Sequence, residues 1–138
     1  MTSVLVPIDG SQQAEEALDT AVSEFPDAEI VLLHVIDPID SGYEAENVVP
    51  GHAEDWYEAH EETAHDLFER ASERTGREFE TAIEVGRPAR EIVEFAEREA
   101  VDHVVMGSHG RSGVARILLG SVAETVVRRS PVPVTVVR

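Results

Sequence analysis

The sequence contains no cysteine and no lysine. The absence of cysteine excludes disulfide bonds and thiolate chemistry. The first residues also lack the basic segment of a signal peptide, so we expect a cytoplasmic protein. No apolar run approaches the ~18 residues that a membrane-spanning helix needs, so we expect no membrane partner. The 138 residues correspond to one domain, residues 1–138, long enough to bury a core.

Basic charge is also scarce. All 11 basic residues are arginine, against 28 Asp and Glu, and the net charge is −17. Strong acidity without lysine favours a halophilic protein, because a salt-rich cytoplasm screens the charge; a GC-rich genome that favours arginine codons is the alternative. The negative charge argues against nucleic-acid binding. Residues 1–102 carry −21 and residues 103–138 carry +4, so the positive charge lies in the last quarter.

Strands and helices are predicted to alternate along the chain. The apolar runs predict strands over residues 3–8, 29–36, 78–85, 102–106 and 132–137. Helical spacing predicts helices over about 12–25, 53–74, 88–100 and 122–129. This alternation predicts a three-layer, Rossmann-like α/β fold with a parallel sheet and right-handed crossovers.

Several single residues refine these elements. Ser11 is predicted to cap the first helix and Gly76 to end the second, and Pro88 is expected at the start of the third. In the third helix Ala100 is expected to face inward. The second helix is expected to bury one face, marked by Ala53, Trp56, His60, Ala64, Leu67 and Ala71.

The most informative stretch runs from Met106 to Val122 and contains Gly107, Gly110 and Gly120. It connects a buried strand to a helix. Glycines allow the backbone to approach a ligand closely, and a helix start offers free N–H groups to an anion, so the stretch fits a phosphate-binding loop. Two structural readings remain open. Glycine also serves simple turns, and Ser121 with Glu124 fits a capping box.

The spacing Gly107-x-x-Gly110, nine residues, then Gly120-Ser121 resembles the nucleotide-binding signature of the universal stress protein family. Residues 4–11, 32–35, 86–89 and 131–137 resemble other parts of that family in the same order. The resemblance implies a five-stranded sheet of order 3-2-1-4-5, of the adenine nucleotide alpha hydrolase-like type. Some members of the family bind ATP and others do not, and the glycine signature is typical of those that do.

The resemblance also implies a site for ATP or AMP with Mg²⁺. In such sheets ligands bind beyond the carboxyl ends of the strands, at the switch point, where Asp9 and Gly107 both lie. Asp9 is expected to bind a ribose hydroxyl or to contact Mg²⁺, although it also suits a turn. An apolar slot for adenine is expected from Pro7, Ile8, Val35 and Met106, although ordinary core packing would equally explain these residues. Phosphate contacts are expected from Gly107, Gly110, Gly120, Ser121 and Val122. His109 and Arg111 are expected to add positive charge, although they also suit a solvated loop.

Three functions follow as hypotheses, and the third is a true enzyme, an ATPase or a nucleotidyl transferase, which measurable turnover would favour. The first is an ATP-binding regulatory module for the stress response, with little or no turnover, because no pairing of a nucleophile with a base is visible. The second is a nucleotide-free dimer that binds a partner protein and has a collapsed or blocked crevice; Ala123, which lacks the hydroxyl of some members, favours it. The resemblance implies a homodimer through the last strand, Val132 to Val137, whose prolines at 131 and 133 suit an edge.

Overall fold

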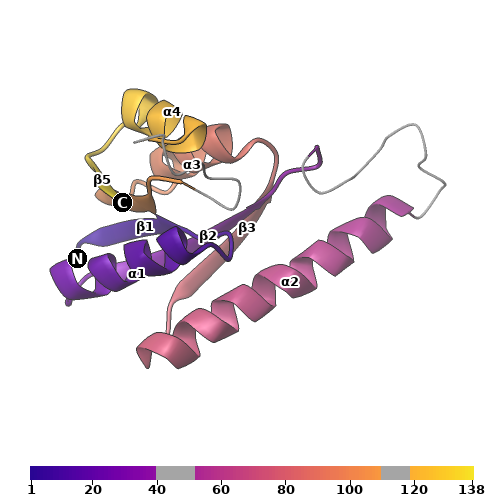
Figure 1. Ribbon diagram of the computed structural model, residues 1–138, viewed down its shortest axis with the longest axis horizontal. Helices are drawn as coiled ribbons and strands as arrows, with labels where there is room; N and C mark the ends of the chain where they lie inside the picture. The colour runs from indigo at the N-terminus through magenta and orange to yellow at the C-terminus, as the bar shows by residue number, and fades with distance from the viewer. Residues whose placement is uncertain (40–51, 110–118) are drawn as a thin grey trace.

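Five parallel strands form the centre of the molecule. The computed structural model describes residues 1–39, 52–109 and 119–138, and over these ranges the strand order is β3-β2-β1-β4-β5 (Figure 1). The strands are β1 (Ser3–Pro7), β2 (Glu29–Ile36), β3 (Glu80–Val85), β4 (His103–Gly107) and β5 (Val134–Val137). The order implied by the family resemblance and the parallel pairing predicted from the alternation are both confirmed.

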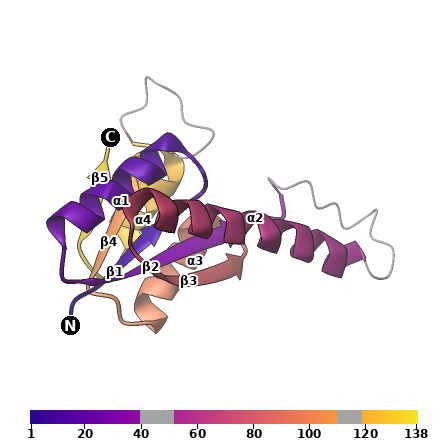
Figure 2. The same ribbon diagram turned by 90° about the horizontal axis from the view of Figure 1, so that it is seen from below.

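Helices cover both faces of this sheet. They are α1 (Gln12–Glu24), α2 (His52–Thr75), α3 (Pro88–Arg98) and α4 (Ser121–Arg129). One core cluster packs α1 and α2 against one face, and a second packs α3 and α4 against the other (Figures 1 and 2). Side chains alternate between the two clusters along β1, where Val4 and Val6 face the first and Leu5 the second. The predicted three-layer fold is confirmed.

The predicted helix boundaries rest on local hydrogen bonds. Ser11 caps α1, and its hydroxyl accepts a hydrogen bond of 3.1 Å from the Ala14 N–H. Gly76 follows α2 with a φ of +71°, and its N–H donates to the Ser72 carbonyl at 2.8 Å. Pro88 is the first residue of α3. These three predictions are confirmed.

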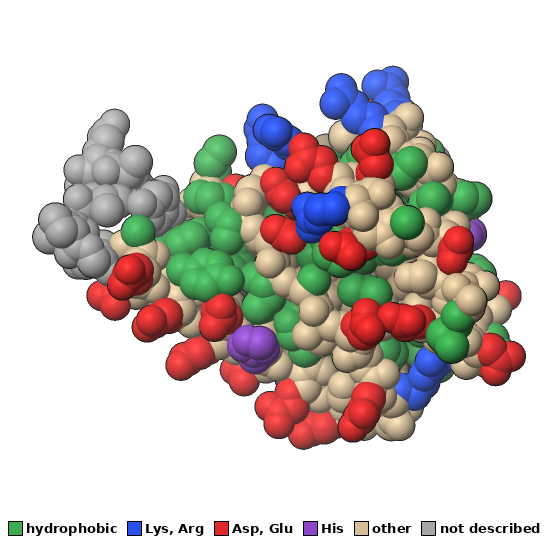
Figure 3. Space-filling model, turned by 180° about the vertical axis from the view of Figure 1, so that it is seen from behind, with side chains coloured by type: hydrophobic (Ala, Val, Ile, Leu, Met, Phe, Trp, Pro, Cys, Tyr) green, Lys and Arg blue, Asp and Glu red, His purple; other side chains and the backbone are tan. Residues whose placement is uncertain are grey.

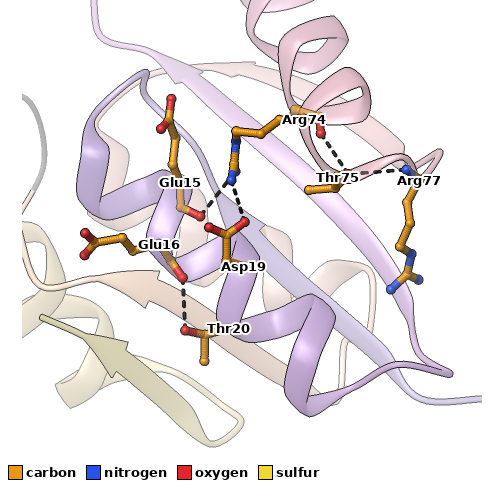
Figure 4. Close-up of polar contacts among 8 residues, drawn as sticks. Glu15, Glu16, Asp19, Thr20, Arg74, Thr75 and Arg77 are labelled. Atoms are coloured by element: carbon orange, nitrogen blue, oxygen red, sulfur yellow. Dashed lines mark hydrogen bonds and ion pairs between the residues drawn. The ribbon is translucent and has the colours of Figure 1, made fainter.

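Helices α1 and α2 are joined at their surface by one arginine. The guanidinium of Arg74 forms an ion pair with Asp19 and donates a hydrogen bond of 3.3 Å to the Glu15 carbonyl (Figure 4). Arg77, just after α2, donates to the Ala28 carbonyl at 3.3 Å. Both contacts fix the C-terminal half of α2 to the body of the protein, whereas its N-terminal half runs past the sheet (Figures 1 and 2).

The buried face of α2 agrees with the predicted one in part. Ala64 and Ala71 are buried as predicted, and Trp56, His60 and Leu67 are half-buried. Ala53 is exposed instead, at the start of the part of the helix that runs past the sheet (Figure 1), and Phe68 is a core residue that the prediction omitted. Ala100 was likewise expected to face inward, but α3 ends at Arg98 and Ala100 is exposed, with a φ of +50°. Ala100 is therefore a turn residue.

The strand β5 is shorter than predicted, because Val132 belongs to a turn. The Ser130 hydroxyl accepts a hydrogen bond of 3.1 Å from the Val132 N–H and donates one of 2.7 Å to the Val132 carbonyl. β5 therefore begins at Val134 and pairs with β4 on one side only.

No helix in the described parts of the chain is long and apolar enough to cross a bilayer.

Candidate functional site

An open cleft of about 1160 Å³ lies over the carboxyl ends of β1, β2 and β4. Its position follows from the connections of two neighbouring strands. The helix that follows β1 packs on one face of the sheet, and the helix that follows β4 packs on the other. Because these connections diverge, a crevice remains between them, which is the usual ligand position in an open α/β sheet.

Most of the predicted contact residues meet in this cleft. The described ones that line it are Pro7, Ile8, Asp9, Val35, Met106, Gly107, His109, Gly120, Ser121 and Val122. The other two, Gly110 and Arg111, lie outside the described residues. Residues that were predicted as ligand contacts from separate motifs of the sequence thus line one cavity.

The turn between β1 and α1 forms the centre of the cleft. The Ile8 N–H donates to the Leu33 carbonyl at 2.9 Å, which extends the pairing of β1 and β2 beyond the last strand residue. The Ser11 N–H donates to Oδ1 of Asp9 at 2.9 Å. Asp9 therefore stabilises its own turn, as the structural reading of this residue expected, while it also lines the cleft. Gly10 has a φ of +85°, a conformation that favours glycine.

The glycines at the end of β4 are held by close packing. A Cβ atom on Gly107 would lie 2.8 Å from Cβ of Gln13 and 3.0 Å from the carbonyl carbon and oxygen of Gln13. A Cβ atom on Gly120 would lie 2.8 Å from the Ser108 carbonyl oxygen, which accepts a hydrogen bond of 2.7 Å from the Gly120 N–H. Both positions need glycine for the fold itself, before any ligand is considered.

The start of α4 differs from the predicted capping box. Gly120 is the N-cap residue and Ser121 is the first helical residue, and no side chain caps the helix. The Glu124 N–H donates to the Gly120 carbonyl at 2.9 Å, so it makes the first intrahelical bond. The N–H groups of Ser121, Val122 and Ala123 precede that bond and have no partner within the helix. The hydroxyl of Ser121 is likewise not used as a cap, and it lies in the lining of the cleft.

The cleft is far less acidic than the rest of the protein. Figure 3 shows a face on which Asp and Glu side chains far outnumber Arg. Of the 28 Asp and Glu, only Asp9 and Asp37 are among the described lining residues. The other ionisable groups in the described lining are three histidines, His34, His60 and His109, and one arginine, Arg70. This distribution favours an anionic ligand.

The histidines at the ends of β2 and β4, His34 and His109, have defined hydrogen bonds. Nδ1 of His34 lies 2.8 Å from the Ile8 carbonyl oxygen. A carbonyl only accepts, so Nδ1 carries the proton and Nε2 of the neutral ring is an acceptor. Nδ1 of His109 lies 3.0 Å from the Ser108 hydroxyl, while its buried Nε2 has no hydrogen-bond partner among the described residues. Both rings therefore retain hydrogen-bonding capacity.

Comparison with known proteins identifies the family. A sequence model described as the Universal stress protein family matches residues 1–138. The chain belongs to the universal stress protein family. Universal stress protein MJ0531 of Methanocaldococcus jannaschii is 38% identical over 145 residues, which cover 98% of this chain and 81% of that protein. The resemblance noted in the sequence is confirmed.

Solved structures agree with this assignment. Protein MJ0577 of Methanocaldococcus jannaschii has a TM-score of 0.84 at 36% identity, with 99% of this chain and 94% of that chain covered. A universal stress protein in complex with cAMP has a TM-score of 0.71 at 27% identity, over 99% of this chain and 97% of that chain. Nucleotide binding thus occurs among structural relatives of this universal stress protein.

Sequence analysis missed one wall of the cleft. It is formed by His60, Thr63, Leu67 and Arg70 of α2. These residues are spaced by three, four and three positions, so they form a single helical stripe. His60 and Leu67 were predicted as core residues. The polar residues Thr63 and Arg70 on the same stripe were the signal that it faces a cavity and not the core.

Proposed function

We propose that this universal stress protein is a regulatory module that binds ATP, or a related adenine nucleotide such as AMP, in the cleft. One observation carries the proposal: Asp9, the end of β4 and the first N–H groups of α4, which have no partner within the helix, surround a single open cavity. A nucleotide needs an apolar slot, a polar group for its ribose and donors for its phosphates, and this cavity has each of them. The relative bound to cAMP supports the same ligand class.

The parts of the nucleotide are assigned by chemistry. The adenine ring lies against Val35 of β2 and Met106 of β4, on the face of the sheet that α3 and α4 cover. The ribose contacts Asp9. The phosphates accept hydrogen bonds from the backbone of Gly107 and from Ser121 and Val122 at the start of α4, where the helix dipole favours an anion. Gly110 and Arg111 remain proposed phosphate contacts from the sequence.

Mg²⁺ fits this site only together with the nucleotide. Among the described residues no group of three or more His, Asp or Glu is arranged to hold a metal ion. Mg²⁺ commonly binds through one or two carboxylates and substrate phosphates, and Asp9 can supply one carboxylate oxygen. When bound, the ion would neutralise phosphate charge. Asp9 would help to hold it beside the phosphates.

The alternative is a nucleotide-free dimer that binds a partner. Under this alternative the crevice would be collapsed or blocked. The described residues line an open crevice, which supports the nucleotide-binding hypothesis over this alternative. Ala123, whose missing hydroxyl favours the alternative, is almost fully buried at the cleft. Both hypotheses include a homodimer. We propose that a second copy pairs with the outer edge of β5, where Val134–Val137 are half-buried in the monomer.

The test is a substitution that separates folding from binding. Ser121→Glu places a carboxylate at the start of α4, where it stabilises the helix by about 0.3–1 kcal/mol but repels phosphate. We expect calorimetric titration with MgATP in molar KCl to show at least a tenfold loss of affinity, with an unchanged or higher melting temperature. Thr125→Glu, one turn further along α4 and outside the cleft, is the control. If wild type binds no adenine nucleotide, the proposal fails and partner binding replaces it.

A further inference from the structure

The wall that α2 contributes to the cleft has no role in the proposed mononucleotide site. All the proposed nucleotide contacts come from β1, β2, β4 and the region around α4. The cleft, at about 1160 Å³, is nevertheless larger than the range of roughly 300–1,000 Å³ that is usual for a small-molecule site. His60, Thr63, Leu67 and Arg70 enclose the additional space on the opposite side of β2.

The side chains of α2 are sorted by charge around its axis. The helix carries eight acidic residues, and none of them lines the cleft: Glu54, Asp55, Glu58, Glu61, Glu62, Asp66, Glu69 and Glu73. The polar groups that do line it are an imidazole, a hydroxyl and a guanidinium. A helix that keeps all of its acidic side chains out of a cavity favours an anionic or neutral ligand in that cavity.

Arg70 is available for such a ligand. Its Nε donates a long hydrogen bond of 3.4 Å to the Asp66 carbonyl, and it forms no ion pair with any described residue. Arg74, one turn further along, is paired with Asp19 instead. A Cβ atom on Gly10 would lie 3.3 Å from Leu67, so this part of α2 lies directly against the turn that carries Asp9. Arg70 follows Leu67 by three residues on the same helical stripe, so it lines the cavity on the α2 side of this turn.

His60 presents a supported flat ring. Its Nδ1 donates to the Trp56 carbonyl at 2.8 Å, and its ring centroid lies 4.7 Å from that of Trp56. The ring is thus fixed on one edge and packed on one side, and Nε2 of the neutral ring is an acceptor. A held imidazole that lines a cleft is a suitable surface for stacking with a nucleobase.

We infer that the cleft accepts a dinucleotide, two nucleosides joined through phosphates, and that α2 binds its second half. Arg70 contacts the bridging phosphates and His60 stacks with the second base. The two residues are ten positions apart, about 15 Å along the helix. Val35 and His60 lie on opposite sides of the end of β2, so the two bases would flank that strand. The inference rests on the proposed nucleotide site.

The test compares diadenosine tetraphosphate with ATP by calorimetric titration, with Mg²⁺ in molar KCl. For wild type we expect one dinucleotide per chain and an affinity at least tenfold above that for ATP. His60→Ala and Arg70→Gln should each remove most of this gain and change ATP affinity less than twofold. The matched controls are His65→Ala and Arg74→Gln, on the same helix but outside the lining of the cleft, and both should retain the gain.

Three results would overturn the inference, and they differ from one another. Equal affinity of wild type for the two ligands shows that α2 binds no second half. An equal loss of ATP and dinucleotide in His60→Ala shows that the α2 wall belongs to the mononucleotide site. If ATP itself does not bind, the proposed function fails and this inference fails with it.

Discussion

Gly107 at the end of β4 lies against the backbone of Gln13 in α1, so closely that a Cβ atom on Gly107 would be 3.0 Å from the Gln13 carbonyl carbon and oxygen. This contact joins the two strand-to-helix connections that form the cleft. Gly107 therefore has a packing role that is independent of any ligand, because backbone atoms, unlike a flexible side chain, cannot move aside cheaply.

We predict that Gly107→Ala destabilises the protein by about 1–3 kcal/mol through overpacking. Gly76→Ala is the comparison, since Gly76 has a φ of +71° but nothing within 4 Å of its added Cβ. It should cost about 1–2 kcal/mol from the backbone conformation alone. Urea unfolding measures both. The clash involves Cβ and the backbone carbonyl of Gln13, and alanine retains both, so Gln13→Ala/Gly107→Ala should restore nothing. Full recovery would show that the clash is with the outer part of the Gln13 side chain.

The buried face of α2 gives a second prediction. Phe68 is 5% exposed in the core, whereas its neighbour Leu67 is half-buried beside the cleft. Phe68→Ala should lose about 3–5 kcal/mol of unfolding free energy. Leu67→Ala should lose less than half as much. Chemical denaturation of the two variants decides the point, and a larger loss for Leu67→Ala would show that the helix buries the face expected from its sequence.

The link between α1 and α2 should contribute little. The side chains of Arg74 and Asp19 are 34% and 56% exposed, so water and salt screen their ion pair. A double-mutant cycle with Arg74→Gln and Asp19→Asn should give a coupling energy of about 0.2–1 kcal/mol at low salt, with a smaller value in molar KCl. A coupling of several kcal/mol, or one that salt leaves unchanged, would contradict this account.

His103 should make stability depend on pH. It lies in β4, packs on Phe25 with ring centroids 4.9 Å apart, and its Nε2 lies 2.7 Å from the Thr135 hydroxyl in β5. Burial lowers the pKa of His103 below the usual 6.5. The unfolded chain therefore binds the proton more readily, and this residue costs stability as the pH falls below about 6.5, by at most ~1.4 kcal/mol per pH unit.

The check is urea unfolding of wild type and His103→Gln between pH 8 and pH 5. The difference in stability between the two should shift in favour of the glutamine variant as the pH falls. His65→Gln changes an exposed histidine on α2 and serves as the control. A constant difference across this range would rule out His103 as the titrating group.

The sequence by itself determined the order of the elements. Alternating apolar runs and helical periodicity predicted a parallel α/β sheet, and Ser11, Gly76 and Pro88 marked helix ends, because caps and turns depend on neighbouring residues. The glycine spacing and the residues at the strand ends indicated the family, and they also located the crevice. These features are local, so they can be read without knowing what packs against them.

The tertiary structure alone decided which surfaces those elements share. On α2, the core stripe of Ala64, Phe68 and Ala71 and the cleft stripe of His60, Thr63, Leu67 and Arg70 have the same helical period, and only the position of the helix against the sheet separates them. Ser121 lost its predicted capping role because Gly120 takes the N-cap position. Gly107 gained a packing role because α1 crosses the end of β4. Each of these depends on contacts between segments that are distant in sequence, and periodicity within one segment carries no information about them.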